Sequence, residues 1–143
     1  MRLYFDTAYI AKCYLNEPDA RKVRKLAQTA DGLYSSAWCI AELACVFRRH
    51  IREGSILPEQ TATLRKVFLD DVRDNVWILS PVSERLLMRV ESLVGGLAKD
   101  VYLRAGDAIH LVSALEAGFT EIWTNDRHLL NAAPHFGLLG RSV

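Results

Sequence analysis

Short apolar segments alternate with longer helical stretches along the whole chain. Four such segments are rich in β-prone residues, at 3–5, 33–35, 76–79 and 121–124, and a last short strand is expected at 138–139. Helices are predicted between them, at 8–15, 20–30, 37–53, 58–74, 83–94, 105–117 and 127–133. Short apolar strands separated by helices are typical of a parallel sheet that is covered by helices on both faces. We therefore expect an α/β fold.

The chain has 143 residues, half of them hydrophobic, which suits one domain over residues 1–143. The formal net charge is +1, so charge neither supports nor excludes a nucleic-acid substrate. We expect no secretory leader, because no apolar stretch follows Arg2, and no membrane-spanning helix, because no apolar run reaches the roughly 20 residues that span a bilayer. We expect a cytoplasmic protein. The three cysteines and three tryptophans lie in apolar contexts and are interpreted as core residues: Cys13, Cys39, Cys45, Trp38, Trp77 and Trp123.

Two acidic residues directly follow predicted strands. Asp6 comes after the first strand, and Asp126 comes after Thr124-Asn125 at the end of the fourth. In open parallel sheets the functional crevice lies outside the carboxyl ends of the strands. Each aspartate can also be only the N-cap of the helix that follows, because Asp is a favoured residue at that position. Taken singly, the two interpretations weigh about equally.

Glu42 is the only charged residue between Ala37 and Phe47. A helix that is apolar all round is a buried one, and an unpaired carboxylate inside it would cost several kcal/mol. Glu42 therefore needs a cation or a dense hydrogen-bond network. The alternatives are a functional site and a structural ion pair, for example with Arg104.

Asp107 lies among small and apolar residues at the start of a predicted helix, where it is either a cap or a site residue. His110 lies three positions later on the same helix face and could share a metal with it. A lone histidine in an apolar helix is more often a packing residue, and that interpretation is favoured for His110.

Four carboxylates that converge would repel one another and raise each other's pKa. A divalent cation relieves that cost, and Mg²⁺ or Mn²⁺ prefers carboxylate and water oxygens. The chain offers no cysteine–histidine set for zinc, no phosphate-binding glycine loop and no G-x-S-x-G motif. Carboxylate-bound metal with open water positions suits phosphoryl chemistry. The expected activity is that of a metal-dependent nuclease with Asp6, Glu42, Asp107 and Asp126 as catalytic and metal-binding residues.

The order and local context of these acids resemble a known family. The relevant segments are Asp6-Thr7, Ala41-Glu42-Leu43, Arg104-Ala105-Gly106-Asp107-Ala108-Ile109-His110 and Thr124-Asn125-Asp126-Arg127-His128-Leu129. Together they resemble the PIN-domain nucleases and, within them, the VapC-type toxins of toxin–antitoxin pairs. The likeness extends over essentially the whole chain.

The resemblance implies a three-layer α/β/α sandwich and Mg²⁺- or Mn²⁺-dependent endoribonuclease activity. It also implies an RNA substrate, a VapB-type antitoxin as partner and a homodimer. Thr124 matches a position that often carries a supporting hydroxyl, and Thr7 is expected to support the acids in the same way. VapC-type antitoxins characteristically thread a segment into the acidic pocket.

Basic residues follow Glu42 along the predicted helix. Arg49 lies seven residues on, about two turns, and so shares the Glu42 face. Arg49, Arg48 and Arg52 are candidates for contacts with RNA phosphates. The alternative is a solvated helix end whose cations are favoured by the helix dipole.

Two other functions stay open at this level. One is a housekeeping PIN nuclease that acts in RNA maturation. The other is a receiver-like signalling domain, which also holds Mg²⁺ with acids at strand ends. Receivers usually have two adjacent acids after the first strand and a late lysine, whereas Asp6 is followed by Thr7 and no lysine follows Lys99.

Overall fold

A computed structural model describes all residues, 1–143. Its strands are β1 (Arg2–Tyr4), β2 (Gly32–Ser36), β3 (Trp77–Ser80), β4 (Glu121–Trp123) and β5 (Leu139–Arg141). β2 pairs in parallel with both β1 and β3, and β4 pairs in parallel with β5. An isolated parallel bridge between Phe5 and Trp123 joins the two groups, so that β1 lies beside β4.

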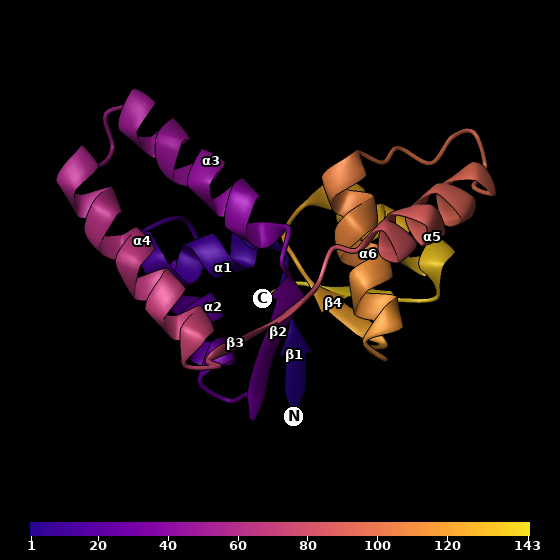
Figure 1. The fold of residues 1–143 in the computed structure, drawn as a ribbon, viewed down its shortest axis with the longest axis horizontal. Helices are drawn as coiled ribbons and strands as arrows, with labels where there is room; N and C mark the ends of the chain where they lie inside the picture. Colours follow the sequence, from indigo (N-terminus) through magenta and orange to yellow (C-terminus); the bar gives the residue numbers. More distant parts are fainter.

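Helices lie on both faces of these strands, as Figure 1 shows. They are α1 (Thr7–Tyr14), α2 (Ala20–Ala27), α3 (Cys39–Arg52), α4 (Pro58–Arg73), α5 (Glu84–Gly95), α6 (Ala105–Glu116), α7 (Arg127–Ala132) and the 3₁₀ turn η1 (Ala133–Phe136). The helices α1 to α4 cover one face, and α5 and α6 cover the other. The predicted three-layer sandwich with a parallel sheet is confirmed.

The sheet separates two hydrophobic cores. Leu3 and Phe5 pack into the core beneath α1 to α4, while Tyr4 packs into the core beneath α5, α6 and α7. This division follows from the strand itself, because successive side chains point to opposite faces of a sheet. With buried apolar residues at positions 3, 4 and 5, β1 and the residue that follows it are covered on both sides of the sheet.

Most helix boundaries agree with the sequence to within a few residues, and the predicted caps at Asp6 and Asp126 are confirmed. Asp6 accepts a hydrogen bond from the Tyr9 amide, and Asp126 accepts from the amides of His128 and Leu129. Asp19, which precedes α2, does not cap it, because its backbone is left-handed and its side chain makes no capping hydrogen bond.

The helix α3 departs from its predicted environment. It begins at Cys39 rather than at residue 37, and its fully buried residues are Cys39, Leu43 and Phe47. The predicted core positions Trp38 and Cys45 are exposed instead. The all-round burial expected for this helix is therefore wrong. The apolar composition of its outer face reflects a surface beside a cavity.

The other two tryptophans agree better with a core interpretation. Trp77 is 2% exposed, and Trp123 is half-buried against the core beneath α1 to α4. None of the helices combines the length and the apolar composition that a membrane-spanning segment requires.

Candidate functional site

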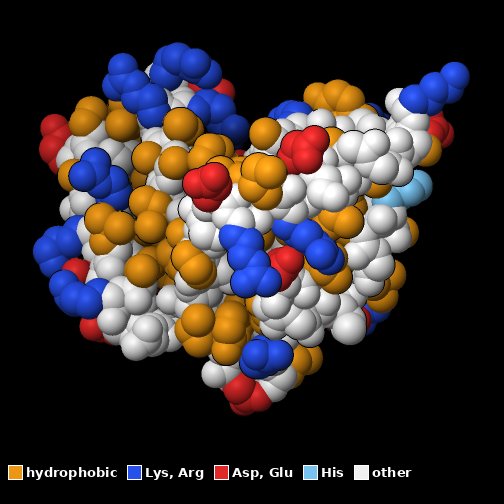
Figure 2. Space-filling model, turned by 45° about the vertical axis from the view of Figure 1, so that its right-hand side comes forward, with side chains coloured by type: hydrophobic (Ala, Val, Ile, Leu, Met, Phe, Trp, Pro, Cys, Tyr) orange, Lys and Arg blue, Asp and Glu red, His pale blue; other side chains and the backbone are white.

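A cavity of about 600 Å³ opens at the carboxyl ends of β1 and β4. Both helical layers contribute to it, which places it between the two lobes of the molecule; Figure 2 shows the hollow between them. All four predicted acids line it, although they come from four separate parts of the sequence. The lining residues are Asp6, Thr7, Ala8, Ala11, Glu17, Trp38, Ala41, Glu42, Cys45, Val46, Arg49, Arg104, Asp107, His110, Asp126 and Leu129.

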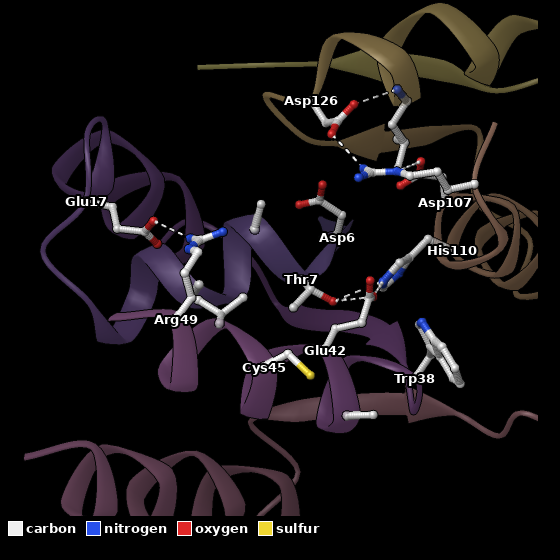
Figure 3. A pocket seen from close by; sticks show the side chains of 16 residues that line it. Asp6, Thr7, Glu17, Trp38, Glu42, Cys45, Arg49, Asp107, His110 and Asp126 are labelled. Carbon is white, nitrogen blue, oxygen red and sulfur yellow. Dashed lines mark hydrogen bonds and ion pairs between the residues drawn. The ribbon is translucent and has the colours of Figure 1, made fainter. Parts of the chain in front are cut away.

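Asp6 lies in the middle of this group, between the other acids in Figure 3. It is 5% exposed. Its Oδ1 accepts a hydrogen bond from the Tyr9 amide at 2.9 Å, and its Oδ2 accepts from the Thr124 hydroxyl at 2.5 Å. Asp6 therefore caps a helix and also lines the cavity. The two interpretations that the sequence allowed do not exclude each other.

Asp126 is linked to Asp6 through Thr124. The Thr124 hydroxyl that donates to Asp6 accepts a bond from the Asp126 amide at 2.9 Å. The Asp126 side chain uses Oδ1 for its helix cap, accepting at 2.8 Å from the His128 amide. One buried hydroxyl, that of Thr124, thus links two of the acids.

Glu42 is held by hydroxyl and imidazole groups. The Thr7 hydroxyl donates to Glu42 Oε1 at 2.8 Å, and His110 Nε2 lies 2.7 Å from the same oxygen. On the other side of the ring, His110 Nδ1 lies 3.1 Å from the Tyr4 hydroxyl. Figure 3 shows Thr7, Glu42 and His110 pointing toward one another.

Asp107 and Asp126 share a guanidinium group. Arg104 Nε donates to Asp107 Oδ2 at 3.1 Å, and Arg104 Nη2 donates to Asp126 Oδ2 at 3.2 Å. Asp107 does not cap α6, since the N-cap residue is Arg104 itself. The ion pair suggested between Glu42 and Arg104 is replaced by these two contacts, and Glu42 uses His110 as its basic partner.

The electrostatics of the acids follow their surroundings. Burial raises the pKa of Asp6 to about 6, although hydrogen bonds from Thr124 and Tyr9 oppose the shift. Burial also acts to raise the pKa of Glu42, but the hydrogen bond and charge of His110 and the bond from Thr7 outweigh it, and the pKa is lowered. The pocket therefore favours the ionised form of Glu42 and disfavours that of Asp6.

The predicted phosphate-binding arginines are only partly brought to this cavity. Arg49 lines it, and its Nη2 lies 3.9 Å from Glu17 Oε2 at the rim. Arg48 lines a separate cavity between α3 and α4, and Arg52 is exposed at the end of α3. Basic side chains gather at the tip of that lobe in Figure 2. Arg49 is thus the one of the three that lines the acidic cavity.

Three residues of the site were missed or misjudged from the sequence. His110 was interpreted as packing, yet its ring contacts Glu42. Arg104 was considered only as a partner of Glu42. Gly106 matters because a Cβ there would lie 2.9 Å from Glu42 Oε2 and 3.1 Å from Trp38 Nε1. The i+3 spacing of His110 from Asp107 was the available signal for the first of these.

The donor set fits a hard divalent cation. The four predicted acids line one cavity together with Glu17, with threonine hydroxyls behind the acids and no cysteine–histidine cluster. The carboxylates are at present directed to internal partners, and no three of them form a ready-made metal cluster. Asp107 and Asp126 face Arg104, whereas Glu42 faces His110. The chemistry fits the cation, and its binding would require carboxylate oxygens to exchange some of these partners for the metal.

Comparisons with known proteins agree with this architecture. The family model of the PIN domain matches residues 3–134. Among solved structures, the chain is similar to one in the crystal structure of VapBC2 from Rickettsia felis bound to a DNA fragment from their promoter. The TM-score is 0.67 and the identity 17%, over 100% of this chain and 99% of that chain. A search of curated proteins finds no match.

The family match extends over the strands and helices that carry all four acids. It decides against the receiver-like alternative, while the structural likeness supports the same fold at low identity. The chain belongs to the PIN domain family, whose members are nucleases.

Proposed function

We propose that this protein is a divalent-metal-dependent endoribonuclease and that it acts as the toxin of a toxin–antitoxin pair. The observation that carries the nuclease proposal is the convergence of Asp6, Glu42, Asp107 and Asp126 on one cavity. Their sequence separation rules out an accidental cluster within one helix. Acids at strand ends and acids on helices from both layers meet only because the fold brings them together.

The roles of the four acids differ in this proposal. Asp6 and Asp126, tied to the same Thr124 hydroxyl, hold a fixed spacing and are the rigid pair of ligands. Glu42 stays ionised and oriented by Thr7 and His110, which suits it to orient a water molecule or to bind the cation. Asp107, in the first turn of α6, is the fourth ligand of the proposed site.

Bound Mg²⁺ or Mn²⁺ would lower the pKa of a water molecule and stabilise negative charge on the phosphate. The four carboxylates are the ligands that would hold it. Arg49, at the rim of the same cavity, is placed to contact an RNA phosphate once it leaves Glu17. Arg48 and Arg52 lie outside the cavity, so any contact they make would be with more distant phosphates.

The choice of RNA and of a toxin role rests on resemblance. The chain resembles VapC-type toxins in its motif set, and the structural neighbour is part of a VapBC2 complex. A VapB-type antitoxin is the proposed partner. The apolar residues on the outer face of α3, including Trp38 and Ile40, offer it a surface next to the acidic cavity.

The test of the nuclease proposal is RNA cleavage by the purified protein with Mg²⁺ or Mn²⁺. We expect cleavage that is abolished by EDTA and reduced at least about 100-fold in Asp6→Asn and Asp107→Asn. Asp100→Asn is the matched control, because it makes the same change on an exposed residue outside the acidic cavity. Undiminished cleavage by Asp107→Asn would contradict the proposed mechanism.

The toxin proposal needs a separate test in cells. Expression of the wild-type chain should arrest growth, Asp6→Asn should not, and the small protein encoded beside it should restore growth. Arrest by Asp6→Asn, or failure of the neighbour to neutralise the toxin, would contradict this role. The proposed homodimer predicts a solution mass about twice 16.1 kDa.

A further inference from the structure

Arg104 is the only lysine or arginine that contacts the four acids. It forms ion pairs with Asp107 and Asp126, while Arg49, the other arginine of the cavity, is paired with Glu17. Its side chain is 58% exposed, whereas that of Asp107 is 12% exposed. A partly solvated cation therefore covers two buried or half-buried carboxylates from the mouth of the cavity.

Of the two contacts that Arg104 makes, the one with Asp126 matters more for metal binding. Asp126 Oδ1 is committed to the α7 cap, where it accepts from two backbone amides. Its other oxygen, Oδ2, is the one that Arg104 Nη2 contacts. Asp126 can therefore offer Oδ2 fully to another cation only when the guanidinium moves.

Arg104 is not placed there to stabilise its helix. It is the N-cap residue of α6, with an extended backbone and no capping hydrogen bond from its side chain. A cation at a helix N-terminus opposes the helix dipole. Because the guanidinium itself is more than half exposed, water screens both ion pairs, and the two contacts hold the group weakly. The side chain can leave without any change in α6.

We propose that Arg104 is an exchangeable cation of the acidic cavity: a divalent metal ion displaces its guanidinium from Asp126 and Asp107, and the freed guanidinium binds a phosphate of the RNA. The proposal rests on the proposed nuclease function. The planar donors of arginine match phosphate oxygens in pairs. Binding of the metal ion to the carboxylates would in this way free a phosphate-binding group at the mouth of the cavity.

The exchange is tested by Mn²⁺ titration calorimetry without RNA. Arg104→Gln should bind Mn²⁺ about fivefold more tightly than the wild type, the equivalent of one lost competing ion pair. Arg49→Gln is the control, since it removes an equal charge from the same cavity without touching the four acids. Its Mn²⁺ affinity should change by less than about twofold.

Two results would overturn the exchange. One is an unchanged Mn²⁺ affinity in Arg104→Gln that is correctly folded by thermal denaturation. The other is an equal gain in Arg49→Gln, which would show a general charge effect. Arg104→Lys should lie between the wild type and Arg104→Gln, because the ammonium group keeps the charge but loses the planar pair of donors.

The second part of the proposal, that the freed Arg104 binds an RNA phosphate, is tested by cleavage kinetics. Arg104→Gln should raise the KM for RNA about tenfold and leave kcat within about threefold, with partial rescue in Arg104→Lys. An unchanged KM in Arg104→Gln would overturn the proposed phosphate contact. If the wild type cleaves no RNA, the proposed function fails, yet the Mn²⁺ titration still decides whether Arg104 competes with the cation.

Discussion

At the scale of single residues, His110 has the most direct influence on the site among the residues outside the acidic quartet. Its Nε2 contacts Glu42, and its Nδ1 faces the Tyr4 hydroxyl. Because an ionised carboxylate oxygen can only accept, the hydrogen of the contact with Glu42 belongs to Nε2, which donates to Oε1. The Tyr4 hydroxyl occupies the opposite ring nitrogen and holds the ring in this orientation.

The prediction is that His110 positions Glu42. His110→Ala should weaken Mn²⁺ binding and lower kcat by about 10- to 100-fold, as expected for loss of a group that orients a metal ligand. His110→Gln, which can still donate, should recover part of both. Tyr4→Phe leaves the imidazole in place and should have a smaller effect. Wild-type Mn²⁺ affinity in a folded His110→Ala protein would rule out this role.

At the scale of secondary-structure elements, the start of α6 packs unusually closely against Glu42. Gly106 occupies the first turn of α6, and an added Cβ would lie 2.9 Å from Glu42 Oε2. That oxygen belongs to a flexible side chain, so the fold can accommodate an alanine. The carboxylate would have to shift, which disturbs the contacts that its other oxygen, Oε1, makes with His110 and Thr7.

Gly106→Ala should therefore lower activity without lowering the stability of the fold. Alanine favours a helix over glycine by about 0.5–1 kcal/mol, so the free energy of unfolding should stay equal or rise slightly. Cleavage and Mn²⁺ affinity should both fall about tenfold or more. Urea denaturation and calorimetry measure the two quantities. Gly96→Ala, at a glycine outside the acidic cavity, is the control, and equal activity of both variants would contradict the prediction.

At the scale of the whole molecule, Asp6 is a site residue that costs stability. The pKa of its carboxyl group is about 6 in the folded protein against an ordinary value of 3.8. Below about pH 3 the group is protonated in both the folded and the unfolded state and has no effect on stability. Between these values folding takes up a proton, so stability falls as the pH rises, and the full cost is present above about pH 6.

Asp6→Asn should remove that cost and keep the helix cap, because asparagine caps as well as aspartate. In EDTA at pH 7.5, its free energy of unfolding should exceed that of the wild type by about 1–3 kcal/mol. At pH 4 the difference should shrink to about 0.5 kcal/mol. Urea unfolding at both pH values measures this, and a difference that does not depend on pH would show that another cause is at work.

The overall architecture was predictable because short apolar strands and capped helices carry local signals. Asp6 and Asp126 were found by their strand-end positions, and Glu42 by its isolation in an apolar helix. The partners of the acids were not predictable, since the contacts of Arg104 with Asp126 and of His110 with Glu42 join residues 22 and 68 positions apart. The outer face of α3 was misjudged because an apolar surface beside a cavity has the composition of a core.

The Phe5–Trp123 bridge joins the two groups of strands next to Asp6, whose amide donates to the Trp123 carbonyl at 3.2 Å. A slip of one position between β1 and its neighbours would move Asp6 about 3.3 Å along the strand direction and turn its side chain away from the cavity. The same slip would send Leu3, Phe5 and Tyr4 into the wrong cores. Packing into the two cores therefore fixes the register of β1, and this register sets the position of Asp6 relative to the other carboxylates.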